Sequence, residues 1–150
     1  MSAPKKKPVS ETDSDSYILD EQIGFLLRKA NQRHRAIFSK IIGEALAPTQ
    51  FATLVSLYFE GPTSQNLLGR RTAMDSATIT GVINRLSQRK LVSKYSAPED
   101  DRLSIIELSD LGQALITEII PNAAEISENT LELLTSAEAQ TLIQLLKKIS

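Results

Sequence analysis

The chain has 150 residues, of which 41% are hydrophobic, so we expect one domain with a substantial core. It contains no cysteine, which excludes disulfide scaffolds, cysteine-based zinc sites and thiol sensing of oxidants. The net charge is −1, yet residues 61–109 hold seven Lys or Arg against five Asp or Glu, a weakly positive balance compatible with modest phosphate binding.

Residues 1–16 are rich in Pro, Ser, Lys and Asp and predict a disordered tail. The lysine cluster at residues 5–7 is most simply a solubilising feature, and the alternative is a flexible arm that touches phosphates. The sequence has no hydrophobic signal core and no apolar run long enough to cross a membrane. We therefore expect a cytoplasmic protein with no membrane partner.

Residues 17–46 carry one apolar stripe that predicts a long helix and also suits packing against a partner helix. The only histidine of the chain, His34, lies on this stripe between Arg33 and Arg35. Two interpretations stay open for His34. It is either a packed, hydrogen-bonded histidine or part of a ligand pocket, where it donates to an acidic aromatic ligand and a nearby arginine supplies the counter-charge.

A second helix is expected from Pro48 to Glu60. Proline suits the first position of a helix, and the Gly61-Pro62 pair ends the pattern. Its larger apolar side chains are most simply core residues, and they are Phe51, Leu54, Val55 and Tyr58.

Two short helices joined by a turn are predicted between Thr63 and Lys90. Thr63 or Ser64 can cap the first, QNLLGRR, and Asp75 can cap the second, SATITGVINRLSQRK. This arrangement is typical of a helix-turn-helix.

The second of these helices has one apolar face and one unusual polar face. A solvated helix face normally carries Glu and Lys, whereas this face carries small and hydrogen-bonding side chains. Such side chains let a helix lie close to a surface, and amides and hydroxyls can read base edges in a major groove. The predicted groove-facing residues are Ser76, Ala77, Thr80, Gly81, Asn84 and Arg85.

Two short runs rich in Val, Ile, Leu and Tyr, LVSKYSA and LSIIELS, predict a hairpin with a polar tip over residues 98–102. An arginine such as Arg102 can enter a minor groove, and a neighbouring carboxylate can hold it in position. A helix-turn-helix followed by a hairpin is a winged helix.

After the hairpin, Ser109 or Asp110 can cap a helix that Pro121 should kink or restart. Thr135 and Glu138 form a capping box for a last helix. Together with the first helix, these helices offer more apolar surface than a winged helix can cover. We therefore expect a homodimer, whose two recognition helices would read a pseudo-palindromic site.

The wing carries the most specific motif of the chain. Asp100-x-Arg102, followed after five residues by Leu108-Ser109, resembles the wing signature of MarR-family transcriptional regulators. One position departs from the family pattern, because Asp101 stands where members often have an arginine. The wing is therefore less cationic, although Arg102 keeps the groove-inserting position.

The resemblance extends over most of the chain. Residues 63–86 and 91–92 are similar to the recognition half of the family, and the flanking helices match its overall plan across about residues 17–150. The family places its ligand pocket where the dimer helices meet the DNA-binding lobe. The resemblance thereby implies that Phe51 and Tyr58 are pocket walls.

These observations predict a mainly α-helical fold with a small β wing. A disordered tail over residues 1–16 precedes a single MarR-like domain over 17–150, with a winged helix at about 48–109 and dimerisation helices at about 17–46 and 110–150. No metal or cofactor is expected. The predicted DNA contacts are Ser76, Ala77, Thr80, Gly81, Asn84 and Arg85 in the major groove, Arg102 in the minor groove, and Gln65, Arg70 and Lys94 on phosphates; the predicted effector contacts are His34, Arg33, Phe51 and Tyr58.

We expect a nucleoid-associated repressor of aromatic-compound catabolic genes that leaves its double-stranded operator when an aromatic acid or its coenzyme A thioester binds. An enzyme is disfavoured, because one histidine, no cysteine and no glycine-rich phosphate loop leave little from which to build a catalytic site. The alternative is a winged-helix module that binds other proteins without specific DNA binding. The discriminating property is the salt dependence of duplex binding.

Overall fold

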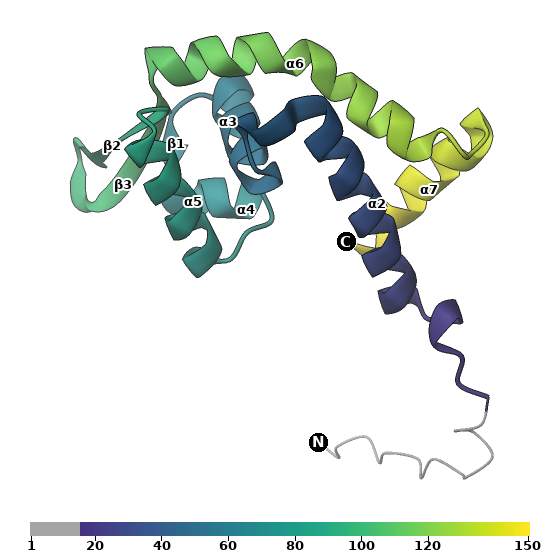
Figure 1. The fold of residues 1–150 in the computed structure, drawn as a ribbon. Coiled ribbons are helices and arrows are strands. Elements are labelled where there is room, and N and C mark those ends of the chain that lie inside the picture. The colour runs from purple at the N-terminus through teal and green to yellow at the C-terminus, as the bar shows by residue number, and fades with distance from the viewer. Residues whose placement is uncertain (1–15) are drawn as a thin grey trace, which may run out of the picture. The chain divides into compact units, whose positions relative to one another are not determined.

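The structure, a computed structural model, describes residues 16–150. The predicted tail, apart from Ser16, and its lysine cluster lie outside the described residues. Two compact units divide the chain, one ending at Arg33 and the other spanning His34–Ser150. The described elements are helices with one three-stranded sheet, so the predicted fold class, mainly α-helical with a small β wing, is confirmed (Figure 1).

The predicted long helix over residues 17–46 is shorter than expected at both ends. A 3-10 turn, η1, covers Leu19–Glu21, and the helix α2 covers Ile23–Ile42. Gly43 adopts a left-handed conformation with φ of +71°, which stops an α-helix, and a second 3-10 turn, η2, follows over Gly43–Ala45. The apolar periodicity therefore predicted the helix but not the residues at which it begins and ends. At the C-terminal end the reason is that Gly43 stops the helix although the apolar pattern continues.

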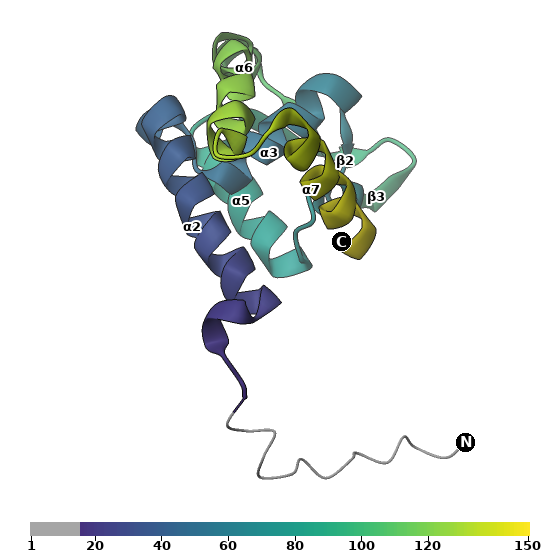
Figure 2. The same ribbon diagram turned by 90° about the vertical axis from the view of Figure 1, so that its right-hand side faces the viewer.

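Helix α3 covers Pro48–Glu60, as predicted. Its first turn is closed by the side chain of Gln50, whose Oε1 accepts from the backbone N–H of Ala47 at 3.1 Å. The helix ends at Gly61, which has φ of +78°. Helix α3 packs against α5, Ser76–Gln88, and against the long helix α6, Asp110–Leu131, and forms the centre of the larger unit (Figure 2).

The predicted helix-turn-helix is present as α4, Gln65–Arg71, and α5, Ser76–Gln88. The turn between them includes Ala73, whose φ of +54° is unusual for a residue other than glycine. The apolar face of α5 is almost completely buried against α3, α4 and the sheet. The main buried residues of this core are Leu54, Leu68, Ile79, Ile83, Leu86, Ile106 and Ile116.

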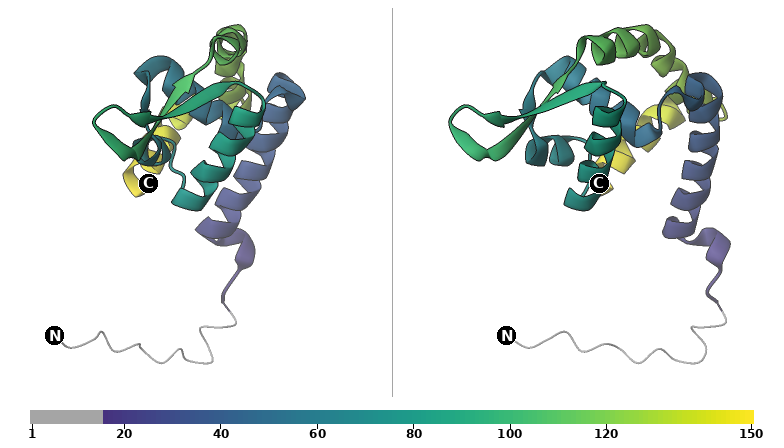
Figure 3. Two further views of the ribbon diagram at one scale, coloured as in Figure 1. Left: turned by 90° about the vertical axis from the view of Figure 1, so that its left-hand side faces the viewer. Right: turned by 60° about the vertical axis from the view of Figure 1, so that its left-hand side comes forward.

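The sheet has the strand order β1-β3-β2 and is antiparallel. Its strands are β1, Thr63–Ser64, β2, Val92–Ala97, and β3, Asp100–Leu108. The hairpin of β2 and β3 projects away from the helices of the same unit (Figure 3). The wing was predicted, whereas β1 was not, because a strand of two residues leaves no period in the sequence.

The tip of the wing is also tighter than predicted. Strand β3 begins at Asp100, which pairs with Ala97, so only Pro98 and Glu99 separate the two strands. A register shift between Ser96 and Ala97 accommodates this turn. The sequence pattern did not predict the first residues of β3 because they are polar. An exposed wing strand does not need the alternation of apolar and polar residues by which strands are predicted.

Side-chain caps lie at the three helix starts that were predicted from capping residues, those of α5, α6 and the last helix. Asp75 accepts from the N–H of Thr78 at 2.7 Å, and Ser109 accepts from the N–H of Gly112 at 3.0 Å. The box at the last helix is reciprocal: Thr135 Oγ1 accepts from the N–H of residue 138 at 3.2 Å, and the side chain of residue 138 accepts from the N–H of Thr135 at 2.9 Å. The three predicted helix starts are thereby confirmed.

Helix α6 covers Asp110–Leu131 and α7 covers Ser136–Ile149. Pro121 does not restart α6, which continues through it as one helix whose ribbon curves along its length (Figure 1). Bending lets a helix tolerate the missing N–H of an internal proline. No helix within residues 16–150 is both long and apolar enough to cross a membrane.

Candidate nucleic-acid interface

Helix α5 buries one face and exposes the other, which is the face that was predicted from the sequence to lie in a DNA groove. Ile79, Val82 and Ile83 are at most 2% exposed. The predicted contact residues lie on the other side, where Ser76, Ala77, Asn84 and Arg85 are exposed and Thr80 and Gly81 are half-buried. The burial of one face by the core therefore determines which side chains α5 can offer to a ligand.

The cap of α5 carries a charge at the start of this face. The backbone N–H of Thr78 donates to the Asp75 carboxylate, and its hydroxyl adds a second hydrogen bond; together they hold the pKa of Asp75 below its usual value. A charged Asp75 also interacts favourably with the N-terminal end of the helix dipole.

Two of the predicted contacts are hydrogen-bonded to each other. Gln65 Nε2 donates to Thr80 Oγ1 at 2.9 Å, and Thr80 Oγ1 donates to the carbonyl of Ser76 at 2.7 Å. A hydroxyl has one proton, so Thr80 retains no donor for a base edge. The pair instead fixes the beginning of α4 against α5.

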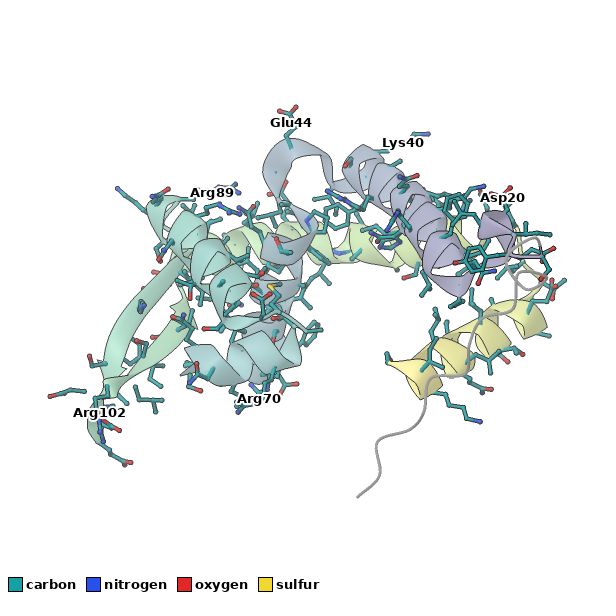
Figure 4. All side chains as sticks on the ribbon, turned by 90° about the horizontal axis from the view of Figure 1, so that it is seen from below. Asp20, Lys40, Glu44, Arg70, Arg89 and Arg102 are labelled. Carbon is teal, nitrogen blue, oxygen red and sulfur yellow. The ribbon has the colours of Figure 1, made fainter. Side chains whose placement is uncertain are left out.

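Arg102 extends from the wing with 92% of its side chain exposed (Figure 4). The Asp100 carboxylate accepts from the backbone N–H of Arg102 at 3.0 Å and from its Nε at 3.2 Å. Within residues 16–150 this is the only partner of the guanidinium, so Nη1 and Nη2 remain available to a ligand. The carboxylate thus orients the arginine without covering it.

A polar cavity of about 200 Å³ lies between α4 and the wing. It brings together three of the predicted DNA contacts, Gln65, Lys94 and Arg102. Asn66 and Ser104 also line it and were not predicted. The only signal that could have found Ser104 is the strand register, which places it opposite Ser96 on β2.

Arg70 lies outside this cavity. It is exposed near the end of α4 and lines a separate hollow of about 180 Å³ together with Ser76 at the start of α5 (Figure 4). The neighbouring Arg71 forms an ion pair with Glu60 of α3 at 4.0 Å. Arg70 and the wing cations are therefore separate basic positions on the winged helix.

The predicted effector residues have different partners in the structure. Phe51 packs edge-to-face on Phe38 of α2 with ring centroids 5.6 Å apart, and Tyr58 packs on Phe59 in the same way at 5.0 Å. Arg33 is half-buried within α2. The structure therefore groups Phe51 with the α2 side of α3 and Tyr58 with the end of α3.

His34 Nδ1 lies 2.9 Å from Thr130 Oγ1 on α6. The Thr130 hydroxyl donates to the carbonyl of Ile126 at 2.7 Å, so it accepts from Nδ1–H of His34. In the tautomer that carries its proton on Nδ1, Nε2 of the ring is an acceptor. Within the described part of the chain, no group of His, Asp and Glu side chains could hold a metal ion.

Comparison with known proteins identifies related regulators. A family model described as the MarR family matches residues 46–104. The chain is 43% identical over 138 residues to the HTH-type transcriptional repressor NicR of Pseudomonas putida, covering 91% of this chain and 87% of NicR.

Two solved structures are similar in both sequence and fold. A probable transcriptional regulator of Pseudomonas aeruginosa has a TM-score of 0.85 and 46% identity, covering 89% of this chain and 100% of its own. BpsR of Bordetella bronchiseptica, whose DNA binding is regulated by 6-hydroxynicotinic acid, has a TM-score of 0.84 and 40% identity, covering 89% of this chain and 96% of its own.

Proposed function

This chain belongs to the MarR family of transcriptional regulators, and from that premise we propose that it is a homodimeric repressor of aromatic-acid catabolic genes that a small aromatic acid releases from its operator. A repressor acts on chromosomal DNA, so the proposal includes a cytoplasmic, nucleoid-associated protein.

The observation that carries the proposal is the surface shared by α5, α4 and the wing. An exposed face of small and hydrogen-bonding side chains on α5 suits a major groove, and an exposed arginine at the wing suits the adjoining minor groove. The proposed base contacts are Ser76, Ala77, Gly81, Asn84 and Arg85, together with Thr80 through its methyl group. Arg102 is proposed to enter the minor groove, and Gln65, Arg70 and Lys94 are proposed to contact phosphates.

The cavity between α4 and the wing supports the phosphate contacts. Lys94 supplies positive charge, and Asn66 and Ser104 supply amide and hydroxyl donors, while Arg102 on the same lining is proposed to reach into the minor groove. Such a mixed set of donors suits one backbone phosphate. Two such surfaces related by a dimer axis would read half-sites about one helical turn, roughly 10 bp, apart.

The effector class follows from the related proteins and from His34. NicR is a repressor and BpsR responds to 6-hydroxynicotinic acid, an aromatic acid with a ring hydroxyl. Because Nδ1–H of His34 is directed to Thr130, a neutral His34 would accept from a ligand hydroxyl through Nε2. We propose hydroxylated aromatic acids first and their coenzyme A thioesters as the alternative, with His34, Arg33, Phe51 and Tyr58 as the candidate contacts.

Release from DNA requires the effector to prefer one arrangement of the protein over another. A coupling free energy of about 1 to 3 kcal/mol between effector binding and DNA binding, the usual range for allosteric proteins, would change operator affinity by roughly 5- to 150-fold.

The test is a fluorescence-anisotropy titration of the protein against DNA from upstream of its own gene, with 6-hydroxynicotinic acid and other aromatic acids added in turn. We expect specific, salt-dependent binding that one acid weakens, and we expect Arg102→Ala to weaken it without lowering thermal stability. Binding to every duplex that is absent or insensitive to salt would contradict the proposal and favour a protein-binding winged helix.

A further inference from the structure

One side chain joins the start of α3 to the end of the recognition helix. Gln50 is the third residue of α3 and is only 8% exposed. Its Oε1 accepts from the backbone N–H of Ala47 at 3.1 Å and from Nη1 of Arg89, the C-cap residue of α5, at 3.3 Å. The two donors occupy the two lone pairs of one carbonyl oxygen.

The bond to Ala47 is ordinary helix capping, whereas the bond to Arg89 is not. A glutamine at the third helical position satisfies the N-cap N–H and needs no second partner. Arg89 lies 39 positions further along the chain, and an exposed arginine at a helix end usually remains in solvent. Figure 4 shows Arg89 on the opposite side of the winged helix from Arg70.

The neighbour of Gln50 in the chain is a candidate effector contact. Phe51 packs on Phe38, and both Phe51 and Gln50 belong to the first turn of α3. Because the two side chains leave the same turn, we expect a ligand that displaced the Phe51 ring and shifted this turn to move Oε1 of Gln50 as well. Through the bond to Arg89, that movement would reach the end of α5.

We propose that Gln50 and Arg89 form a positioning link that holds the C-terminal end of α5 to the first turn of α3, and that the effector acts on the recognition helix through this link. The second half of this statement rests on the proposed function. The link itself is a property of the free protein. Arg89 acts through Gln50 and is not a DNA contact.

Hydrogen–deuterium exchange of the full-length protein tests the link without DNA or ligand. The amides of Arg89, Lys90 and Leu91 donate to carbonyls of the last turn of α5, so their exchange reports on that end of the helix. Gln50→Met and Arg89→Met should each accelerate this exchange by about 2- to 10-fold, the range for losing one hydrogen bond. The double variant with both substitutions should exchange no faster than the faster of the two single variants.

Two further variants make the exchange result decisive. Gln50→Glu keeps an acceptor for both donors and should retain the protection of the unmodified protein, which separates the link from a general loss of folding. Lys90→Met removes a neighbouring positive charge that has no bond to Gln50, and it should leave the exchange unchanged. Unchanged exchange in Gln50→Met would overturn the link.

Affinity for the upstream DNA, measured with and without 6-hydroxynicotinic acid, tests the regulatory half. Gln50→Met should reduce the ratio of the two affinities and leave the salt dependence of binding unchanged. If Arg89→Met instead lowers the slope of log affinity against log salt by about one, Arg89 contacts a phosphate and the proposal is wrong. An unmodified protein that binds no DNA, or ignores the acid, contradicts the proposed function, while the exchange experiment still decides the link.

Discussion

At the scale of single residues, two helical glycines have opposite surroundings. A Cβ at Gly81 of α5 would meet only the Arg85 side chain, at an ordinary contact distance of 3.5 Å. A Cβ at Gly112 of α6 would overlap the backbone carbonyl of Leu91. Packing in the fold therefore requires glycine at position 112 but not at position 81. Because glycine weakens a helix, its presence at position 81 needs an explanation other than packing.

We explain Gly81 by close approach to DNA, which makes a prediction at this position. Gly81→Ala should raise the free energy of unfolding by about 0.5–1 kcal/mol, because alanine is the better helix former. It should also weaken specific DNA binding by roughly tenfold, since the added methyl group keeps α5 away from the base edges. Denaturant unfolding and anisotropy titration measure the two effects.

Gly24→Ala in α2, where a Cβ meets nothing within 4 Å, is the matched control and should leave DNA binding unchanged. A Gly81→Ala protein that binds DNA as well as the unmodified protein would contradict the close-approach explanation.

At the scale of elements, the base of the wing is held against the start of α6. The backbone N–H of Ser109 donates to the carbonyl of Leu91 at 3.1 Å, and the Ser109 hydroxyl donates to the carbonyl of Lys90. Lys90 itself has φ of +59°, an uncommon conformation for a side-chain-bearing residue. These bonds join the segment between α5 and β2 to the N-cap of α6, so we expect a movement at the base of the wing to be transmitted to α6.

Gly112→Ala should disrupt this junction. We expect a loss of about 3 kcal/mol in the free energy of unfolding, because the new methyl group would force the backbone at Leu91 away from α6. Thermal and urea unfolding measure the loss, and Gly81→Ala serves as the control for the same substitution at a tolerant helical site. Full stability of Gly112→Ala would mean that α6 is free to shift at its first turn.

At the scale of the whole molecule, α7 leaves a large apolar face exposed. Leu145 is 54% exposed and Ile149 is 67% exposed. A hollow of about 420 Å³ lies along the same helix between Leu134 and Leu145. Soluble proteins rarely leave such a contiguous apolar face in water, so a second copy of the chain is its expected cover.

Leu145→Lys should therefore yield a monomer, because a charged ammonium would be buried in the dimer interface. Sedimentation measures the change in mass, and operator affinity should fall by roughly 100-fold or more as the two half-sites lose their joint binding. Gln144→Lys adds the same charge to a neighbouring position of α7. A Leu145→Lys protein that sediments as Gln144→Lys does would contradict this placement of the interface.

The sequence by itself determined the parts of the protein that depend on short-range contacts. The caps at Asp75, Ser109 and Thr135 join residues three positions apart, so both partners can be seen in one stretch of chain. The apolar period then located the core face of α5. The similarity to NicR over 91% of this chain, together with the matched family model, confirms the family inferred from the wing motif, and with it a regulator rather than an enzyme.

Only the tertiary structure decided which distant residues meet. Strand β1 forms because packing brings Thr63 opposite Ile106, and the Gln65–Thr80 and Gln50–Arg89 bonds join helices through side chains that look like ordinary polar surface in the sequence. The physical reason is the distance along the chain between the residues that interact. A capping bond is specified by two nearby residues, whereas a bond between elements depends on the packing of every apolar side chain that sets their relative position.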